Sequence, residues 1–587
     1  MFTALAIVIV AIALGTALGL FGGRQTLLLQ PVYAFGFVAA LAVVAGDLLP
    51  EAAEALGVVA LGMFVIGLLV PTVIEAAARH RSARKSQSGE GASVNIGVFA
   101  LFIHQLGDGA ALGGVVGSGA ALDVAVAIGA HSIPLVTLMV TLTAQELGVV
   151  RAVLRAVVLG VATILGVIAT QLVPAADFAV AQPYTSALVA GVLVHLILHA
   201  PPSSIVRPVV ARLLELFAIA AAITIVVLGG HEESLFAGVV TASFVRLALA
   251  SAPALLLGLV AAAGMQTMGA RLPATWMHGG PRFLQALRGA VIGVPLPVCT
   301  CGVLPTARAL LERGASPSLI IGFVTAAPIL GLDTFLITAR LVSPGFAVGR
   351  VLAVICVAVA AASVVIRKLK PSQLAIRARV QGPQSFAARS SAVTKTPLTP
   401  PWRRAVHHFD ELVFHVVPWT VAGLAIASYL DVVLRANAID ARWIDVCVVL
   451  AIALPSYVSA AAVTPIAAML LTKGLSPGAA LAGLVIGPAT DRATIDFLKR
   501  SFGLKATVAA LTGGIVTLLV VAFAVNAWAT EVNVAIAADS IFARVCTVIL
   551  VLLGVRSIWQ SGIVAWAHAL SRTPREEWRV SRAYARV

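Results

Sequence analysis

The chain alternates long apolar runs with short polar loops, and this pattern predicts a bundle of membrane-spanning helices. A helix needs about 20 apolar residues to cross the hydrocarbon core of a bilayer. Eight runs of about that length occupy the first part of the chain, and we expect them to form one unit, residues 1–230. They lie at 2–22, 31–50, 56–75, 95–117, 121–145, 152–173, 183–200 and 210–229.

Beyond this unit the pattern continues, but it is broken twice. Segment 289–311 contains Pro295, Pro297 and Pro305, and segment 446–471 is broken in the same way. Proline has no backbone N–H and disfavours the helical conformation of the residue before it. We therefore predict an all-α polytopic membrane protein with about 15 full spans and two broken or re-entrant segments.

The two broken segments belong to an internal duplication. A shift of 160 residues places identical residues on one another without a gap. The pairs include Pro295 and Pro455, Pro305 and Pro465, Gly314 and Gly474, Ser316 and Ser476, Pro317 and Pro477, Pro328 and Pro488, and Thr334 and Thr494. Paired broken segments in two halves of a chain indicate the binding site of a transporter.

The predicted organisation follows from these runs and from the polar stretch between the halves. That stretch is rich in Ser, Thr, Pro, Arg and Gln, a composition typical of a flexible linker. After the first unit, the expected parts are a first repeat at 231–366, a cytoplasmic linker at 367–404, a second repeat at 405–530, and a last span with a basic tail at 531–587.

Loop charges predict the orientation. The basic loop from Arg79 to Lys85 places the N-terminus outside, because basic residues concentrate in cytoplasmic loops. The basic linker and C-terminal tail fall in the cytoplasm only if both broken segments return to the side they entered from. The two halves are then inverted, a common plan among secondary transporters. The alternative is a parallel duplication with two kinked but complete spans.

Composition excludes several classes of protein. The chain is 60% hydrophobic and 11% charged, and its mean hydropathy is +1.03, which excludes a soluble globular protein. The net charge of +15 is distributed over loops that set orientation, so we expect no nucleic-acid partner. No phosphate-binding Gly-x-x-x-x-Gly-Lys-Ser/Thr loop is present, and we expect neither nucleotide hydrolysis nor any other enzyme activity.

Candidate soft ligands lie in the first broken segment. Cys299 and Cys301 are separated by one residue, and thiolates suit soft ions such as Cu(I), Zn(II) and trivalent arsenic. The alternative is that both are small apolar fillers, since free cysteine is commonly buried. Ser459 and Ala461 take their places in the second repeat, so the site is predicted to be asymmetric.

Carboxylates follow the later prolines of each repeat. Asp333 comes after Pro328, and Thr490 and Asp491 come after Pro488. Ionisable groups within a span are costly and mark a pathway, a proton relay or an internal ion pair. We expect these side chains, with Pro305 and Pro465 at the breaks, to line the substrate site. For Asp491, an ion pair with Arg492 is the structural alternative, as is an Asp496–Arg492 pair.

The first unit carries a second set of candidate ligands. His104, Gln105 and Asp108 lie on one predicted span and His131 on the next, at spacings that keep polar groups on one helix face. Imidazole and carboxylate groups suit zinc, iron or manganese. The alternative is hydrogen bonding between helices. Further polar groups that could line the same path are Asp47, Glu51, His195 and His199.

Two resemblances follow from these motifs. Cys299-Thr-Cys301-Gly-Val-Leu-Pro305, the Gly-Ala-Ser turn beginning at Gly314, and Pro328-Ile-Leu-Gly-Leu-Asp333 resemble the predicted-permease family of bacterial arsenical and heavy-metal efflux proteins. The string from Gly474 to Thr494 is similar to that family's second repeat, so the resemblance covers about 230–530.

The first unit resembles the ZIP (Zrt/Irt-like) metal transporters. The resemblance rests on eight spans, a basic loop after the third, His104-Gln105-x-x-Asp108-Gly and His131-Ser-x-Pro. It implies that these polar groups are metal ligands in residues 1–230.

We therefore predict a permease of the cytoplasmic membrane that transports a soft metal or metalloid ion, with efflux implied by the resemblance. It would hold no permanent cofactor, contact lipid and its ion substrate, and could form a homo-oligomer. Two alternatives remain: a membrane thiol-redox protein that uses Cys299 and Cys301, and a metal-binding sensor or scaffold without transport.

Overall fold

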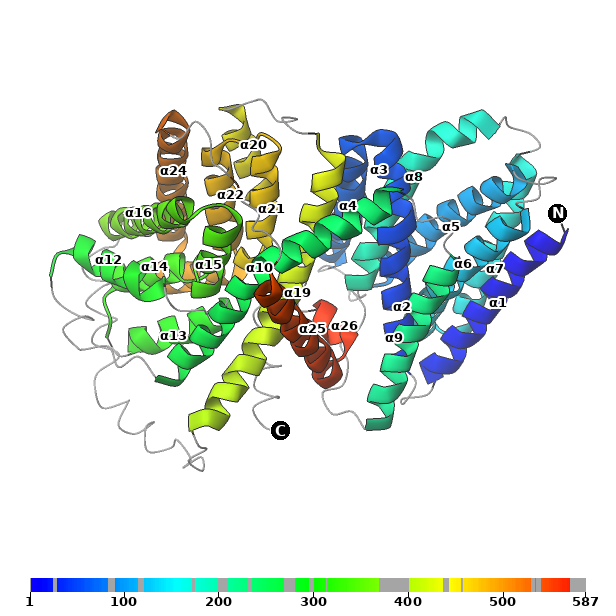
Figure 1. Cartoon of the computed structure of the whole chain (residues 1–587), viewed down its shortest axis with the longest axis horizontal. Helices are drawn as coiled ribbons and strands as arrows, with labels where there is room; N and C mark the ends of the chain where they lie inside the picture. Colours follow the sequence, from blue (N-terminus) through cyan, green and yellow to red (C-terminus); the bar gives the residue numbers. More distant parts are fainter. Residues whose placement is uncertain are drawn as a thin grey trace. The chain divides into compact units, whose positions relative to one another are not determined.

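The structure is a computed structural model, which describes most of the chain. The described residues are 2–24, 29–82, 90–114, 121–170, 175–198, 209–229, 235–268, 280–294, 300–312, 314–368, 401–435, 443–454, 458–528, 534, 540–568 and 570. All regular elements within these ranges are helices, so the all-α expectation is confirmed for them. Figure 1 labels the helices in chain order.

The chain forms two compact units. The first comprises Met1–Val239 together with Ile558–Ser571, and the second comprises Val240–Ser557 with Arg572–Val587. A short segment near the C-terminus thus packs into the first unit.

The helices of the first unit follow the apolar runs closely. Its long helices are α1 (Phe2–Arg24), α2 (Leu29–Val43), α4 (Val58–Ser82), α5 (Glu90–Gly114), α6 (Ala121–Leu147), α7 (Val149–Ala169), α8 (Ala175–Leu198) and α9 (Val209–Gly229). The span expected at 31–50 runs on without a break to Leu56: α2 continues into the π-helical turn η1 (Val44–Leu48) and then into α3 (Leu49–Leu56). Pro50 lies in the first turn of α3, where its missing N–H does not interrupt the helix.

Small residues bring the helices of this unit close together. A Cβ atom at Gly67 of α4 would lie 2.1 Å from the carbonyl oxygen of Leu188 on α8, and one at Gly191 of α8 would lie 2.1 Å from that of Phe64 on α4. Without a hydrophobic driving force between helices in lipid, such close backbone packing supplies much of the stabilisation. Substitution at either glycine would push the two helices apart.

In the part of the second unit that the structure describes, two sets of six helices precede α25, and we call them half one and half two. Half one consists of α10 (Leu235–Met268), α12 (Arg282–Gly293), α13 (Thr300–Glu312), α14 (Pro317–Ala326), α15 (Leu332–Leu341) and α16 (Pro344–Lys368). Half two consists of α19 (Pro401–Val433), α20 (Ile444–Ala453), α21 (Ala460–Thr472), α22 (Pro477–Ala489), α23 (Arg492–Phe502) and α24 (Leu504–Trp528). After half two come α25 (Ile541–Ser561) and α26 (Ile563–His568), the latter in the first unit.

The helix boundaries repeat at the same offset as the sequence. Shifted by 160 residues, α13 coincides with α21 and α16 with α24 at both ends, while α14 and α22 share their first residue. In each half a turn separates the third helix from the fourth and another separates the fourth from the fifth. The apolar stretch 318–341 is therefore not one continuous helix, because Pro328 and Gly331 lie in the turn between α14 and α15.

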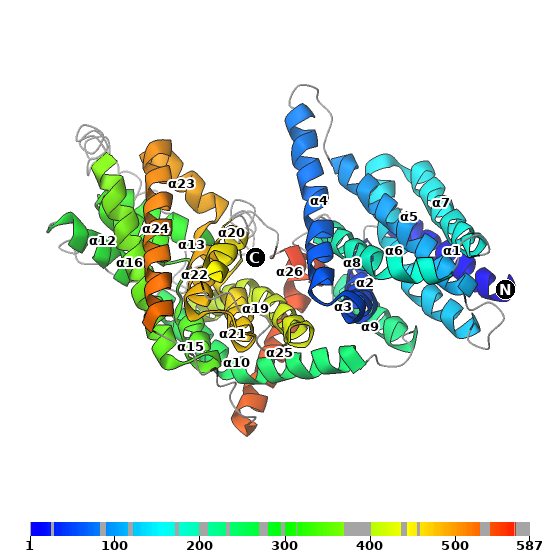
Figure 2. The same ribbon diagram turned by 90° about the horizontal axis from the view of Figure 1, so that it is seen from above.

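Helices of the two halves pack against one another in exchanged pairs. Helix α13 of half one contacts α23 of half two, and α15 of half one contacts α21 of half two. The equivalent helices α16 and α24 pack side by side; in Figure 2, α16 starts beside α15 at one end and α24 starts beside α23 at the other, so they run antiparallel.

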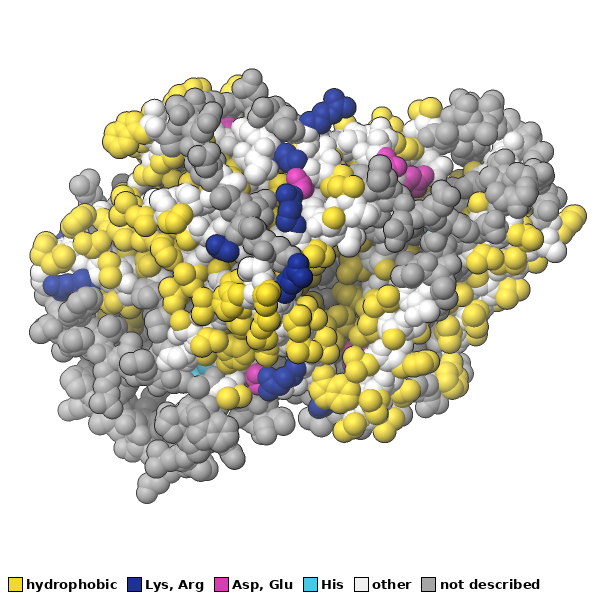
Figure 3. All heavy atoms as spheres, viewed as in Figure 1, with side chains coloured by type: hydrophobic (Ala, Val, Ile, Leu, Met, Phe, Trp, Pro, Cys, Tyr) yellow, Lys and Arg dark blue, Asp and Glu magenta, His cyan; other side chains and the backbone are white. Residues whose placement is uncertain are grey.

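Eight helices in the described part of the chain are long and apolar enough to cross a membrane. They include Phe2–Phe21 and Val149–Ala169 in the first unit, and Pro344–Val365, His408–Val433 and Leu504–Trp528 in the second. Large hydrophobic side chains such as Leu154 (61% exposed) and Val520 (64%) lie on their surfaces. Figure 3 shows hydrophobic side chains spread over the visible face with few charges among them. The protein is therefore a polytopic membrane protein, since such surfaces are stable only in lipid.

Candidate functional site

The first broken segment, 289–311, is described at 289–294 and again from Thr300 onward. Cys299 and Pro455 lie outside the described residues, and so do the side chains of Cys301 and Pro305, although both residues fall within α13. The predicted thiol site therefore stays a prediction. Pro465, its counterpart in the second break, is buried within α21.

Asp333 lies in the first turn of α15, directly after the turn that follows Pro328. Its side chain is 7% exposed, and its carboxyl accepts hydrogen bonds from the backbone amides of Asp333 and Thr334. The Thr334 hydroxyl accepts from the amide of Gly331 at 2.9 Å, which caps the helix. A carboxylate at a helix N-terminus is stabilised by the unpaired amides there. Asp333 also interacts electrostatically with Arg350.

Arg350, on α16, is the largest fully buried side chain among the described residues, with 0% exposure. Its Nη1 donates to the hydroxyls of Thr338 at 2.8 Å and Thr464 at 3.1 Å. Its Nη2 donates to the carbonyl oxygens of Ile329 at 3.1 Å and Leu484 at 3.3 Å. We call these five residues the arginine site.

Sequence reasoning missed Arg350, although a signal was present. A charged residue within the apolar run 346–366 is costly in a membrane and faces the protein interior by default. The internal repeat does not mark Arg350, because the matching position in half two holds Ala510.

The arginine site satisfies backbone groups that proline leaves unpaired. Within α22, the carbonyl of Leu484 would normally accept from residue 488, but Pro488 has no N–H. In half one, the carbonyl of Ile329 lies in the turn between α14 and α15. The guanidinium of Arg350 thus reaches a carbonyl at the proline break of each half. Irregular backbone at membrane depth needs such partners.

Thr490 and Asp491 lie at the equivalent turn of half two, and both serve helix ends. Asp491 is 5% exposed, and its Oδ2 accepts from the backbone amide of Thr494 at 3.1 Å. The Thr490 hydroxyl donates to the carbonyl of Ile486 at 3.2 Å. The side chain of Arg492 lies outside the description, whereas Asp496 pairs with Arg500 at 3.8 Å.

A further polar cluster lies at the N-terminus of α22. Asp445, on α20, accepts from the amide of Ser476 at 2.8 Å. Asn526, on α24, accepts from the amide of Gly478 at 2.6 Å and donates to the Ser476 hydroxyl at 2.9 Å. These bonds satisfy amides at the start of α22 that have no partner within the helix. The cluster fixes α22 against α20 and α24.

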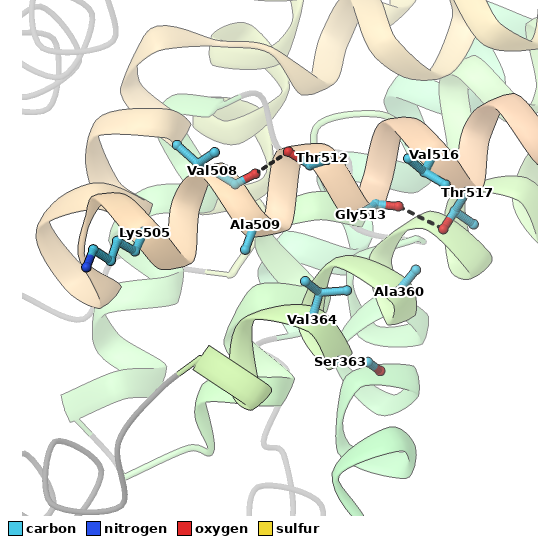
Figure 4. A pocket seen from close by; sticks show the side chains of 10 residues that line it. All are labelled: Ala360, Ser363, Val364, Lys505, Val508, Ala509, Thr512, Gly513, Val516 and Thr517. Carbon is cyan, nitrogen blue, oxygen red and sulfur yellow. Dashed lines mark hydrogen bonds between the residues drawn. The ribbon is translucent and has the colours of Figure 1, made fainter.

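An open cavity of about 620 Å³ runs between α16 and α24. Figure 4 shows ten side chains along it, among them Ser363 and Val364 from α16 and Lys505, Thr512 and Thr517 from α24. The hydroxyls of Thr512 and Thr517 donate to carbonyls of their own helix, at 2.8 Å each, so they offer little to a polar substrate. The cavity is lined mainly by small and apolar side chains.

In the first unit, Gln105 is the polar residue that joins helices. Its side chain is fully buried; Nε2 donates to the Ser132 hydroxyl on α6 at 3.0 Å, and Oε1 accepts from the Thr163 hydroxyl on α7 at 2.8 Å. On the same helix, Nε2 of His104 lies 3.6 Å from Oδ2 of Asp108, and both side chains are largely buried. Gln105 thus forms side-chain hydrogen bonds to two neighbouring helices.

The remaining predicted ligands of the first unit are dispersed or undescribed. His195 is buried on α8, at 3% exposure, and Glu51 is exposed and accepts from Nε2 of Gln182 at 2.7 Å. The side chains of Asp47 and His131 lie outside the description, as does the whole of His199. Within the described residues, no three His, Cys, Asp or Glu side chains are grouped closely enough to hold a metal ion.

Comparison with known proteins concerns mainly the second unit. Residues 236–527, just under half of the chain, match the family model described as "Predicted permease". The UPF0718 protein YcgR of Bacillus subtilis (strain 168) is 30% identical over 87 residues, which is 15% of this chain. The match spans 30% of that curated relative's length. No solved structure matches the chain. The two matches support the permease family for this chain, and with it a membrane transporter.

Proposed function

We propose that the protein transports a soft metal or metalloid ion across the cytoplasmic membrane, in the direction of efflux. The substrate would pass between the two halves of the second unit, near the start of α13 and the turns before α15 and α23. Cys299 and Cys301 would bind the ion, and Asp333 and Asp491 would contribute carboxylates along the route. We also propose that the linker and the C-terminal tail face the cytoplasm.

The observation that carries the proposal is the exchanged packing of the broken elements. Helix α13, which follows the first break, contacts α23, and α21, which follows the second break, contacts α15. Elements from both halves therefore meet near the irregular backbone, as they do in transporters built from paired repeats. The antiparallel arrangement of α16 and α24 supports an inverted rather than a parallel repeat.

Replacement of both thiols tests the substrate class. Serine keeps the size and hydrogen bonding of cysteine but replaces a soft ligand with a harder one. Cells that carry Cys299→Ser with Cys301→Ser should lose arsenite and Cu(I) efflux while the protein remains at its normal level in the membrane. Cys447→Ser, at an exposed cysteine on α20, is the matched control. Full efflux by the double variant would overturn the thiol site.

For the first unit we propose a metal-binding role in line with its resemblance to ZIP transporters. The His104–Asp108 pair supports this role, because an imidazole and a carboxylate lie together in a largely buried place on α5. His104→Ala should lower the zinc content of the purified protein, measured by elemental analysis. His408→Ala, at a partly exposed pair with Glu411, is the control. Unchanged zinc content in the first variant would contradict the role.

A further inference from the structure

The arginine site connects the two halves of the second unit. Thr338 and Ile329 belong to half one, whereas Thr464 and Leu484 belong to half two. The same guanidinium therefore holds α15, α21, α22 and the turn after α14 to α16. Both hydroxyls are already oriented, since Thr338 donates to Thr334 at 2.7 Å and Thr464 donates to Ala460 at 2.7 Å.

This arrangement is directional. The planar guanidinium presents its N–H groups in a fixed fork, so four acceptors can be reached together only in one relative placement of the elements that carry them. A buried charge is strongly destabilising if its partners are removed. The helices around Arg350 cannot slide past one another without losing several of these bonds.

A second contact holds the other end of α21. Lys473, just beyond the helix, pairs with Asp431 of α19 at 3.0 Å, and Asp431 also pairs with Arg246 of α10 at 2.6 Å. Helix α21 is thus fixed by the arginine site in its first half and by this ion-pair cluster after its last turn.

The equivalent place in the duplication has none of these bonds. The equivalent positions lie 160 residues away, in the other half. Ala510 matches Arg350, Leu498 matches Thr338, Leu304 matches Thr464, and Val324 matches Leu484. All four lie in the same buried hydrophobic cluster, with exposures of 9% or less. We call these residues the apolar counterpart. Contacts there are not directional, so α13 and α23 can shift relative to each other at lower cost.

We propose that Arg350 is a positioning residue of the permease, which holds the interface of α15 and α21 fixed while the interface of α13 and α23 rearranges during transport. The assignment of the moving interface rests on the proposed function. The fixed interface does not, because it follows from the hydrogen bonds of Arg350.

Hydrogen–deuterium exchange of the full-length protein in lipid nanodiscs tests the fixed interface. Loss of hydrogen bonds to a charged donor should raise exchange at least about tenfold in 332–341 and 460–472 of Arg350→Gln. Arg340→Gln, at an exposed arginine on α15, should leave both segments unchanged. Should Arg350→Gln fail to fold, Arg350→Lys keeps the charge but not the fork, and the same increase is expected. Unchanged exchange in a folded Arg350 variant overturns the positioning role.

Arsenite added to the wild-type protein tests the moving interface. We expect altered exchange in 300–312 and 492–502, with 332–341 and 460–472 unchanged. A change in the second pair of segments, or in neither pair, overturns the assignment of α13 and α23 as the moving elements. If arsenite is also not transported by the wild-type protein in liposomes, the proposed substrate fails, while the Arg350 variants still decide whether the interface of α15 and α21 is held by arginine.

Discussion

At matching places in the last helix of each half, the two copies of the repeat carry Arg350 and Ala510. The helices around them have equivalent boundaries and exchange partners in the same way. Around Arg350, neighbouring elements are joined by four hydrogen bonds to one side chain. Around Ala510 the matching side chains are apolar and pack in one buried hydrophobic cluster.

The duplication preserved the helix boundaries of the repeat but not the interactions that hold the helices together. Pro328 and Pro488 are shared, so each half has a helix whose regular hydrogen bonding is cut short. In half two, the guanidinium of Arg350 reaches the carbonyl that Pro488 leaves unpaired, that of Leu484. In half one it reaches the carbonyl of Ile329, in the turn that contains Pro328. The interface of α15 and α21 therefore contains the polar arginine site, whereas the equivalent interface of α13 and α23 contains the apolar counterpart.

Replacement of Arg350 by leucine should have the largest effect on stability. The change removes the donor for four acceptors and the positive charge near Asp333, and breaking a buried charge interaction costs about 3–5 kcal/mol. Unfolding in detergent, followed by circular dichroism, measures the loss. Arg340→Leu should cost little, because Arg340 is exposed. A loss for Arg350→Leu no larger than for this control would remove the distinction between the two interfaces.

Truncation in the apolar counterpart should have a smaller effect. Leu498→Ala leaves a cavity among the side chains of α13 and α23, but the transfer term is reduced because the unfolded helices remain in an apolar medium. We expect a loss of about 2 kcal/mol, at the low end for Leu→Ala. The matched control is Leu504→Ala, at a side chain that is 59% exposed. Equal unfolding midpoints for the two variants would show that Leu498 contributes no packing.

Thr464→Val removes one acceptor of the arginine site without changing the side-chain volume. Hydrogen bonds to charged groups contribute about 1.5 kcal/mol, so the loss in unfolding free energy should be about that size. In an Arg350→Leu background the same change should have almost no effect, since the bond is already absent. A double-mutant cycle with additive losses would contradict a direct interaction. Thr512→Val, whose hydroxyl bonds only within α24, is the control.

Gln105→Leu should have the smallest effect of the four. Gln105 is also a fully buried residue that joins three helices, but it is neutral. Ser132 and Thr163 can return their hydroxyls to their own helices, as Thr163 already does toward Leu159 at 3.3 Å. A loss of about 1 kcal/mol is expected, in keeping with hydrogen bonds between membrane helices. A loss as large as that of Arg350→Leu would show that charge is not what distinguishes the arginine site.

Much of the second unit could be predicted from the sequence, because prolines and glycines act locally. The 160-residue offset that aligns Pro305 with Pro465 also aligns the helices that contain them. The turn within the apolar stretch 318–341 also follows from local residues, since it contains Pro328 and Gly331. In half two the equivalent turn comes at Thr490 and Asp491, directly after the helix that contains Pro488.

The arginine site could not be assembled in the same way. Arg350 and Leu484 are 134 residues apart, and the bond between them depends on how two halves pack rather than on any local pattern. In the first unit, the spacing of His104 and Asp108 did place both groups together, because i and i+4 share a helix face. Their relation to other helices depended on contacts such as that of Gln105 with Thr163, which no spacing reveals.

The segment Ile558–Ser571 has a consequence for how the protein is made. It belongs to the first unit, where the amide of Ile563 donates to Glu215 of α9 at 2.9 Å, yet it is synthesised long after Val239 leaves the ribosome. At about 5–20 residues per second, the intervening stretch takes on the order of 15–65 s to translate. The eight long helices of the first unit must therefore wait in the bilayer for their last partner, while residues 240–557 of the second unit are made and inserted.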